Sequence, residues 1–136
     1  MGYQNSCYTY FKIIGVFDPD EVSKELGLEP VEMQRAGDKR KNGTVYEYSC
    51  CTFSRCNMYD ILVEKQMMQT IAPFLDKISE LQKIKEKYDV DYWLEIVPSI
   101  FPGEPTPCLA PNKEVIKFCC ETDTSIDIDL YVNEVE

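Results

Sequence analysis

The sequence predicts an α+β domain of two layers, in which a mostly antiparallel sheet of four to six strands carries helices on one face. Segments of alternating apolar and polar residues, which are typical of half-buried strands, are separated by segments with helical spacing. Hydrophobic residues make up 44% of the 136 residues, which is enough for one core. We therefore expect a single domain over residues 1–136.

The strand that organises this prediction is expected near the end of the chain, at residues 125–132, S-I-D-I-D-L-Y-V. Apolar and polar residues alternate strictly there, and an extended backbone places them on opposite faces. We expect the helices to cover the apolar face, which consists of Ile126, Ile128, Leu130 and Val132. The other face, with Asp127, Asp129 and Tyr131, is expected to meet solvent.

The chain begins with a predicted strand and a short helix. Residues 7–15 alternate in the strand pattern, with Thr9, Phe11 and Ile13 on one face. A helix is predicted from Pro19, because Asp18 is a good N-cap and proline is favoured at the first helical position. Gly27 suits the residue that ends this helix.

A hairpin and a long helical segment follow. Asn42 and Gly43 predict a tight turn, after which residues 44–53 read as a strand. Residues 57–88 have helical spacing, with Asn57 or Asp60 as the cap. Pro73 removes a helical hydrogen bond, so we expect a kink or two helices.

A second strand–helix unit leads to the closing strand. Residues 90–100 predict a strand with Leu94 on the core side and Trp93 and Glu95 on the other. Asn112 is a candidate cap for a helix to about residue 121, with Val115, Ile116, Phe118 and Cys119 expected to face inward. Residues 18–26 and 110–118 are similar, which fits either an internal duplication of a βαβ-like half or shared helix-start chemistry.

The composition excludes several kinds of chemistry. The chain has no histidine, which excludes His-based acid–base catalysis and Ser-His or Cys-His nucleophile pairs. Lys plus Arg number 14 and Asp plus Glu 24, giving a net charge of −10. An acidic surface disfavours phosphate backbones and anionic membranes, so we expect no nucleic-acid or membrane partner. It favours a basic partner, although solubility alone also explains the charge.

Seven cysteines indicate the redox compartment. Their number is odd, the first ten residues hold no apolar signal segment, and no apolar run is long enough to span a bilayer. Reduced thiols in a cytoplasmic protein fit best. Adjacent cysteines suit a tetrahedral metal poorly, and we expect neither a metal nor a cofactor.

Several segments, in their order along the chain, resemble a known family. They are F-K-I-I-G-V-F-D-P-D-E-V-S-K-E-L-G-L-E-P at residues 11–30, R-A-G-D at residues 35–38, the long helical segment and the closing S-I-D-I-D-L-Y-V. This order resembles the bacterial domain-of-unknown-function family 4279 over nearly the whole chain. The resemblance implies a bacterial cytoplasmic protein and supplies neither an activity nor catalytic residues.

The polar sheet face is the candidate binding surface. If the predicted strands are neighbours, alternation gathers acidic and aromatic side chains opposite the helices, namely Tyr8, Tyr10, Trp93, Glu95, Asp127, Asp129 and Tyr131. Ring faces and carboxylates together suit a cationic peptide or basic protein, which favours a non-enzymatic protein- or peptide-binding module. A solvated sheet face with aromatic cross-strand pairs explains the same pattern.

The basic arm before the Asn42–Gly43 turn is an alternative site. It contains Arg35, Lys39, Arg40 and Lys41. Four cationic side chains would suit an anion or an acidic partner. Lysine and arginine also protect exposed strand edges, which is the simpler explanation.

Two further functions remain open. A domain of this size and class also suits a small-ligand-binding or regulatory dimer formed through a sheet edge or face, so both a monomer and a homodimer are compatible with the sequence. Asp127 and Asp129 would lie about 7 Å apart along a strand. A third carboxylate facing them would favour a carboxylate-based, metal-dependent enzyme.

Overall fold

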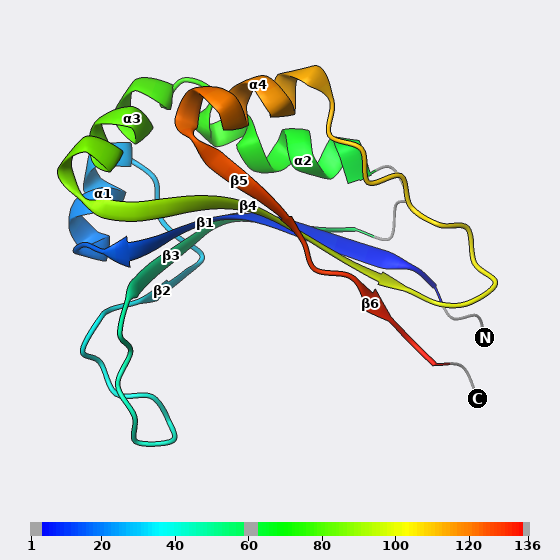
Figure 1. The fold of residues 1–136 in the computed structure, drawn as a ribbon, viewed down its shortest axis with the longest axis horizontal. Coiled ribbons are helices and arrows are strands. Elements are labelled where there is room, and N and C mark those ends of the chain that lie inside the picture. The colour runs from blue at the N-terminus through cyan, green and yellow to red at the C-terminus, as the bar shows by residue number, and fades with distance from the viewer. Residues whose placement is uncertain (1–3, 59–62, 135–136) are drawn as a thin grey trace.

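The computed structural model describes residues 4–58 and 63–134. Within these residues, six strands form one open sheet, and four α-helices with one short 3₁₀ helix lie on one of its faces (Figure 1). The strands are β1 (Ser6–Val16), β2 (Glu32–Gln34), β3 (Ser49–Met58), β4 (Asp89–Ile100), β5 (Thr124–Ile128) and β6 (Tyr131–Val132). The helices are α1 (Pro19–Leu26), α2 (Val63–Ile71), η1 (Ala72–Phe74), α3 (Ile78–Lys87) and α4 (Lys113–Thr122).

The sheet is mixed but mostly antiparallel. Its order is β2-β3-β1-β4-β5, and β6 continues beyond β5 along β4. β1 is antiparallel to β3 and β4, β2 is antiparallel to β3, and β5 and β6 are parallel to β4. The predicted two-layer α+β class is therefore confirmed.

The two strand–helix–strand units agree in strand direction but differ in whether their two strands are adjacent. The strand after each helix runs parallel to the strand before it, because β2 and β1 are both antiparallel to β3 and β5 is parallel to β4. β3 lies between β1 and β2, whereas β4 and β5 are adjacent. Internal duplication stays a prediction.

The signals read for α1 are confirmed. The Asp18 side chain accepts a hydrogen bond from the Asp20 N–H at 3.0 Å, and Pro19 occupies the first turn. Gly27 ends the helix in the left-handed conformation, with φ of 67°. Val22 and Leu26 are fully buried, so packing against the core stabilises this short helix together with its two capped ends.

The core lies between the helices and the middle strands. Phe11 of β1 contacts Phe74 of η1, with ring centroids 4.5 Å apart, and Tyr92 of β4 donates a hydrogen bond to the Leu81 carbonyl at 2.6 Å. Leu94 of β4 is fully buried in the same cluster. Four residues of α4 were expected to face inward. Val115, Phe118 and Cys119 are buried as predicted, but the prediction was wrong for Ile116, which is exposed.

The segment expected as one long helix divides differently. Asn57 lies in β3 and does not cap a helix, while Asp60 lies outside the described residues. The expected break at Pro73 is confirmed, because η1 separates α2 from α3 there. The helical segment within the described residues therefore begins later than its spacing predicted.

The hairpin before β3 is a separate ladder that projects away from the sheet on the side opposite the helices (Figure 1). The Arg40 N–H donates to the Thr44 carbonyl at 2.7 Å, and Lys39 bridges Val45. The predicted Asn42–Gly43 turn is present, but β3 begins only at Ser49. The boundaries of this strand were therefore placed too early at both ends.

The closing strand has the predicted faces but not the predicted burial. Ile126 pairs with Leu94 and Ile128 with Ile96, so the apolar residues lie on the helix side as expected. Ile128 is nevertheless 45% exposed. The assignment of Ile128 to the core was wrong, because the strand continues beyond the part of the sheet that the helices cover.

A proline explains why this strand is split into β5 and β6. The Asp129 N–H donates to the Ile96 carbonyl at 2.9 Å. In a parallel ladder the next bond to Asp129 would come from the N–H of residue 98. That residue is Pro98, which has no N–H, so the ladder loses one bond between the two short strands.

β1 and β4 approach each other closely at Gly15. It pairs with Val90, and a Cβ placed on it would overlap the carbonyl oxygen of Asp89. Only hydrogen fits between the two backbones at this point.

Candidate functional site

The sheet face opposite the helices, called here the open face, carries all seven residues predicted for it. The ladders place Tyr10, Glu95 and Asp127 in one row across β1, β4 and β5. Tyr8 pairs with Val97 and Tyr131 with Ser99, both on the same side of β4. The following residues therefore share one face of the sheet, and their role in binding stays a prediction: Tyr8, Tyr10, Trp93, Glu95, Asp127, Asp129 and Tyr131.

A β-bulge brings an arginine to this face that alternation did not predict. Thr9 pairs with Cys56 but Phe11 pairs with Phe53, so β3 carries one extra residue there. Ser54 has a positive φ of 54°. The extra residue reverses the alternation, and the Arg55 guanidinium consequently lies over the Tyr8 ring, 4.3 Å from its centroid.

Glu95 is the centre of the face and is nearly buried. Its exposed fraction is 5%, and Lys12 Nζ lies 3.1 Å from its Oε1 atom. Burial raises the pKa of the Glu95 carboxyl, a hydrogen bond with Asp127 adds to the rise, and Lys12 opposes it. Because Asp127 is its neighbour in the next strand, Glu95 belongs to a carboxyl pair balanced by one lysine.

Two tyrosines extend the surface from this pair. The Tyr8 and Tyr10 rings stack with centroids 6.0 Å apart and planes at 15°. Burial and the nearby Glu95 carboxylate raise the pKa of Tyr10 to about 12. Tyr10 therefore keeps its hydroxyl proton at neutral pH and can donate a hydrogen bond.

The rim toward β6 is wetter. Tyr131 is 54% exposed, and its hydroxyl donates to Asp129 Oδ2 at 3.1 Å. Trp93 is half-buried between its cross-strand neighbours Lys12 and Ser125. Aromatic area, a phenolic donor and carboxylates are thus available along one continuous strip.

Residues missed at the sequence level complete the face. Lys12 and Asp91 follow from alternation, since they occupy the same side of β1 and β4 as the predicted set. The position of Arg55 could not be predicted in this way, because no local sequence pattern indicates the β-bulge that places it on the open face. The open face therefore contains cations as well as carboxylates.

The alternative basic site is divided by the structure. Arg35 binds both Asp18 and Asp20, with N–O distances of 2.7 Å, and these bonds raise the pKa of Arg35. Its donors thus hold the start of α1 to the arm before the hairpin. Of the four predicted residues, Lys39, Arg40 and Lys41 remain together at the exposed hairpin end, where Arg40 lies over the Tyr46 ring.

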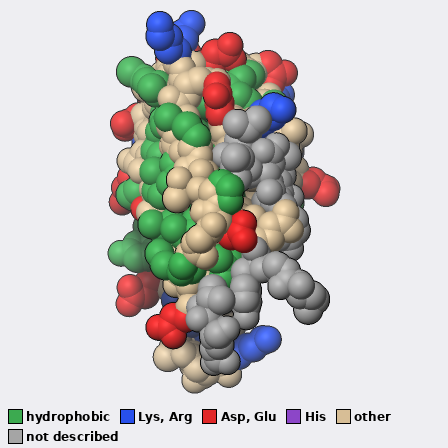
Figure 2. All heavy atoms as spheres, turned by 90° about the vertical axis from the view of Figure 1, so that its right-hand side faces the viewer, with side chains coloured by type: hydrophobic (Ala, Val, Ile, Leu, Met, Phe, Trp, Pro, Cys, Tyr) green, Lys and Arg blue, Asp and Glu red, His purple; other side chains and the backbone are tan. Residues whose placement is uncertain are grey.

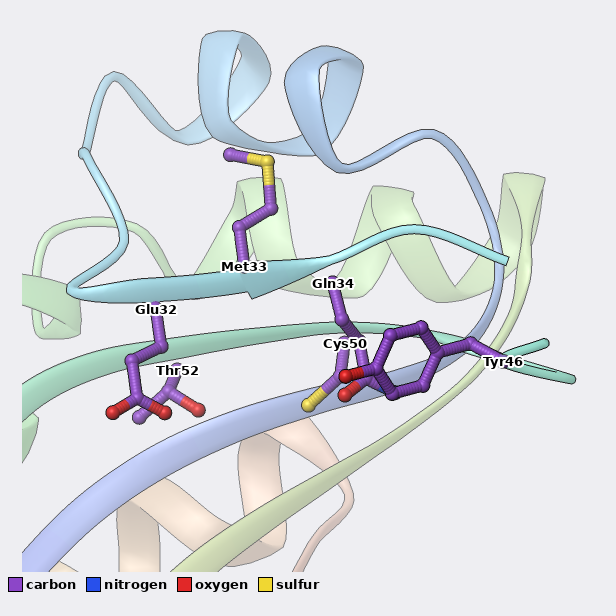
Figure 3. A pocket seen from close by; sticks show the side chains of 6 residues that line it. All are labelled: Glu32, Met33, Gln34, Tyr46, Cys50 and Thr52. Carbon is purple, nitrogen blue, oxygen red and sulfur yellow. The ribbon is translucent and has the colours of Figure 1, made fainter. Parts of the chain in front are cut away.

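A pocket of about 330 Å³ lies on the open side beneath β2 and β3 (Figure 3). Glu32, Gln34, Cys50, Thr52 and Tyr46 project toward it, whereas Met33 points to the opposite side of β2. The Gln34 amide donates to the Tyr48 carbonyl at 3.3 Å, which ties the hairpin arm to β2. This pocket is one place where a small ligand could bind, and the small-ligand alternative stays a prediction.

One family model matches residues 5–133, and its description is Domain of unknown function (DUF4279). The chain belongs to this family. The match spans every described strand and helix of the fold, which confirms the resemblance read from the ordered segments. No curated protein and no solved structure matches the chain.

In this DUF4279 chain the acidic residues do not converge on a common point. Within residues 4–58 and 63–134, no group of three or more Cys, Asp or Glu side chains is placed to hold a metal ion. The Asp127 and Glu95 carboxyls instead lie side by side on the paired strands β5 and β4. Such a pair can bind a cationic group from the solvent side but offers no third ligand.

The same described residues contain no helix that is both long enough and apolar enough to cross a membrane. All the described helices lie against the sheet as one layer (Figure 1). The open face and the outer strand edges are therefore not covered by the described helices.

Proposed function

We propose that this DUF4279 protein is a bacterial, cytoplasmic, non-enzymatic module that binds a basic protein or peptide on its open face. The observation that carries the proposal is the row Tyr10–Glu95–Asp127 on the open face. Trp93 lies next to this row on the same face, and Tyr131 lies further along it, opposite Ser99. Aromatic side chains anchor many interfaces, and carboxylates beside them select a cationic partner.

The charges support a partner that is basic but not simply polycationic. Lys12 already balances Glu95, and Arg55 already covers Tyr8. Asp127 and Asp129, nearer the rim toward β6, are accessible to a new cation, as is the exposed Asp91 near the start of β4. A net charge of −10 attracts such a partner from a distance, and salt screens that attraction.

The test uses Trp93, which is the chain's sole tryptophan and lies on the open face. Proteins captured from the source cells by wild type are purified and titrated back, with Trp93 fluorescence as the readout. Binding should change the emission, weaken as salt rises and be lost in Asp127→Asn with Asp129→Asn. Trp93→Ala should abolish capture while circular dichroism shows a folded protein.

The matched control changes the competing basic site. Replacing Lys39, Arg40 and Lys41 by glutamine removes the hairpin cations and should leave capture intact. If the hairpin variant loses every partner and both open-face variants keep them, the hairpin is the binding site and the proposal is wrong.

A further inference from the structure

The sheet ends in an edge formed by β5 and β6. The sheet order leaves β2 at one side and these two strands at the other, and β5 and β6 cross in front of the sheet in Figure 1. Among the described residues, no segment pairs with their outer side. A free edge presents N–H and C=O groups that another strand can bind.

This edge is also apolar on its helix side. Ile128, Leu130 and Val132 are 45%, 49% and 64% exposed. Figure 2 looks at the end of the molecule that carries β6, and hydrophobic side chains gather there along the left, the side to which this edge is turned. Neighbouring apolar side chains left in solvent mark an interaction surface.

The hydrogen bonds of this edge show which backbone groups point toward β4 and which point outward. The N–H groups of Asp129 and Asn133 donate inward to the carbonyls of Ile96 and Ile100, both at 2.9 Å. Successive residues of a strand direct these groups to opposite sides. The N–H and C=O groups of residues 128, 130 and 132 therefore point outward, where a new strand would lie.

We propose that the occupant of this edge is a second copy of the chain, paired antiparallel about a two-fold axis at Leu130. In this register Leu130 faces the same residue of the second copy, and Ile128 faces Val132. All three are outward-bonding positions, so a regular antiparallel ladder forms. A two-fold edge contact of this kind closes on itself and joins two sheets into one.

The charges select this register. Leu130 at the axis places Asp129 opposite Tyr131, whose hydroxyl already donates to an Asp129 carboxylate within the chain. An axis at Ile128 would instead place Asp127 opposite Asp129, and like charges directly opposite destabilise a sheet.

An axis at Val132 is disfavoured for another reason. It would place the apolar Leu130 opposite the carboxylate of Glu134. The exposed Leu130 would then lose its apolar partner. Of these three axes, only Leu130 pairs the exposed residues Ile128, Leu130 and Val132 with one another and separates the aspartates. Glu134 then lies opposite Ile126, which is partly buried against the core and loses less by that pairing than the exposed Leu130 would.

The dimer does not depend on the proposed peptide binding. It uses the edge of the sheet, and its measurement needs no other protein. It would, however, place two open faces side by side in one continuous surface. Salt also separates the two proposals, since screening strengthens association between two copies of charge −10 but weakens capture of a basic partner.

The first experiment is sedimentation equilibrium over a range of protein and salt concentrations. Wild type should reach twice the chain mass of 15.8 kDa, with tighter association at high salt. Leu130→Lys places like charges at the axis and should weaken association roughly tenfold or more. Ile116→Lys changes an equally exposed residue of α4 and should leave it unchanged.

The second experiment tests the register by charge rescue. Ile128→Glu alone should weaken the dimer, and adding Val132→Lys should restore it. The two positions lie about 13 Å apart within one strand, too far to pair inside a chain. Restoration therefore reports contact between copies.

Two outcomes would overturn the inference. One is a wild type that stays at the monomer mass at every concentration and salt, which would leave the edge to a strand from another protein. The other is a dimer that is insensitive to both Leu130→Lys and Ile128→Glu, which would place the interface elsewhere.

Discussion

Glu95 carries a nearly buried carboxyl on a sheet face that no described helix covers. Its cross-strand neighbours Tyr10 and Asp127 and its ion-pair partner Lys12 limit its contact with water. Removing solvent from a carboxyl disfavours its charged form, and a hydrogen bond with a second carboxyl does the same. The surroundings of Glu95, at the centre of the candidate site, therefore make its ionised form less stable than it would be in water.

This gives a pH dependence with a definite sign. Burial raises the pKa of Glu95 in the folded protein above its unfolded value of about 4.3, so the folded state keeps a proton that the unfolded state has lost. The contribution of Glu95 to the free energy of unfolding should therefore fall as pH rises from about 4.3 through the folded pKa. Urea unfolding of wild type and Glu95→Gln should be measured across that range. As pH rises, the free energy of unfolding of wild type should fall relative to that of Glu95→Gln.

A surface carboxylate provides the control. Glu32 is an exposed residue of β2, and the Glu32→Gln variant measured in parallel shows the effect of removing a solvent-exposed carboxylate. A difference between wild type and Glu95→Gln that stays constant from acid to neutral pH would mean that Glu95 ionises as it does in the unfolded chain.

At the level of the secondary-structure element, most of the fold was predicted from two local features, the apolar–polar alternation of strands and the capping residues of helices. The faces of β1 and β4 and the limits of α1 follow from residues such as Asp18, Gly27 and Leu94, because these signals are local. The end of β3 did not follow, since Asn57 resembles a helix cap although it pairs with Tyr8. Pairing with a distant strand outweighed a local preference.

The candidate site divides in the same way. Trp93, Asp127 and Tyr131 were placed on their face by period alone. Arg55 was not, because the bulge at Ser54 depends on how β3 fits β1. The sequence also predicted which face Ile128 occupies but not its exposure, because that depends on where the helix layer stops.

Two leucine-sized side chains test this point about burial. Leu94→Ala removes a fully buried side chain and should cost about 2–5 kcal/mol of unfolding free energy. Ile128→Ala, at a half-exposed edge, should cost less than about 1 kcal/mol in the monomer. Chemical denaturation at low protein concentration measures both. Equal losses would show that the helix layer reaches further along β5 than described.

At the level of the whole molecule, the seven thiols are spread over both layers and are all free. Cys7, Cys51 and Cys119 are buried, whereas Cys108 and Cys120 are exposed. Burial raises the pKa of Cys7 and of Cys119 to about 11. Thiolates are the reactive form, so the buried thiols are protected both by access and by protonation.

Thiol titration without reductant should therefore show two levels. In denaturant all seven cysteines should react. In the native protein Cys108 and Cys120 should react first, and the rate at the buried thiols should rise with pH because more thiolate forms. Recovery of five or fewer thiols in denaturant would mean that the protein carries a disulfide.

The close approach at Gly15 also limits how this chain can evolve. At core positions of β1 such as Phe11 and Ile13, exchange for an apolar side chain of similar volume is tolerated best, because neighbouring side chains can repack. At residue 15 the neighbour is the Asp89 backbone, and every change of the codon that replaces glycine introduces an atom where there is no room. Core residues around this contact between β1 and β4 can therefore change during evolution, whereas residue 15 has to remain glycine.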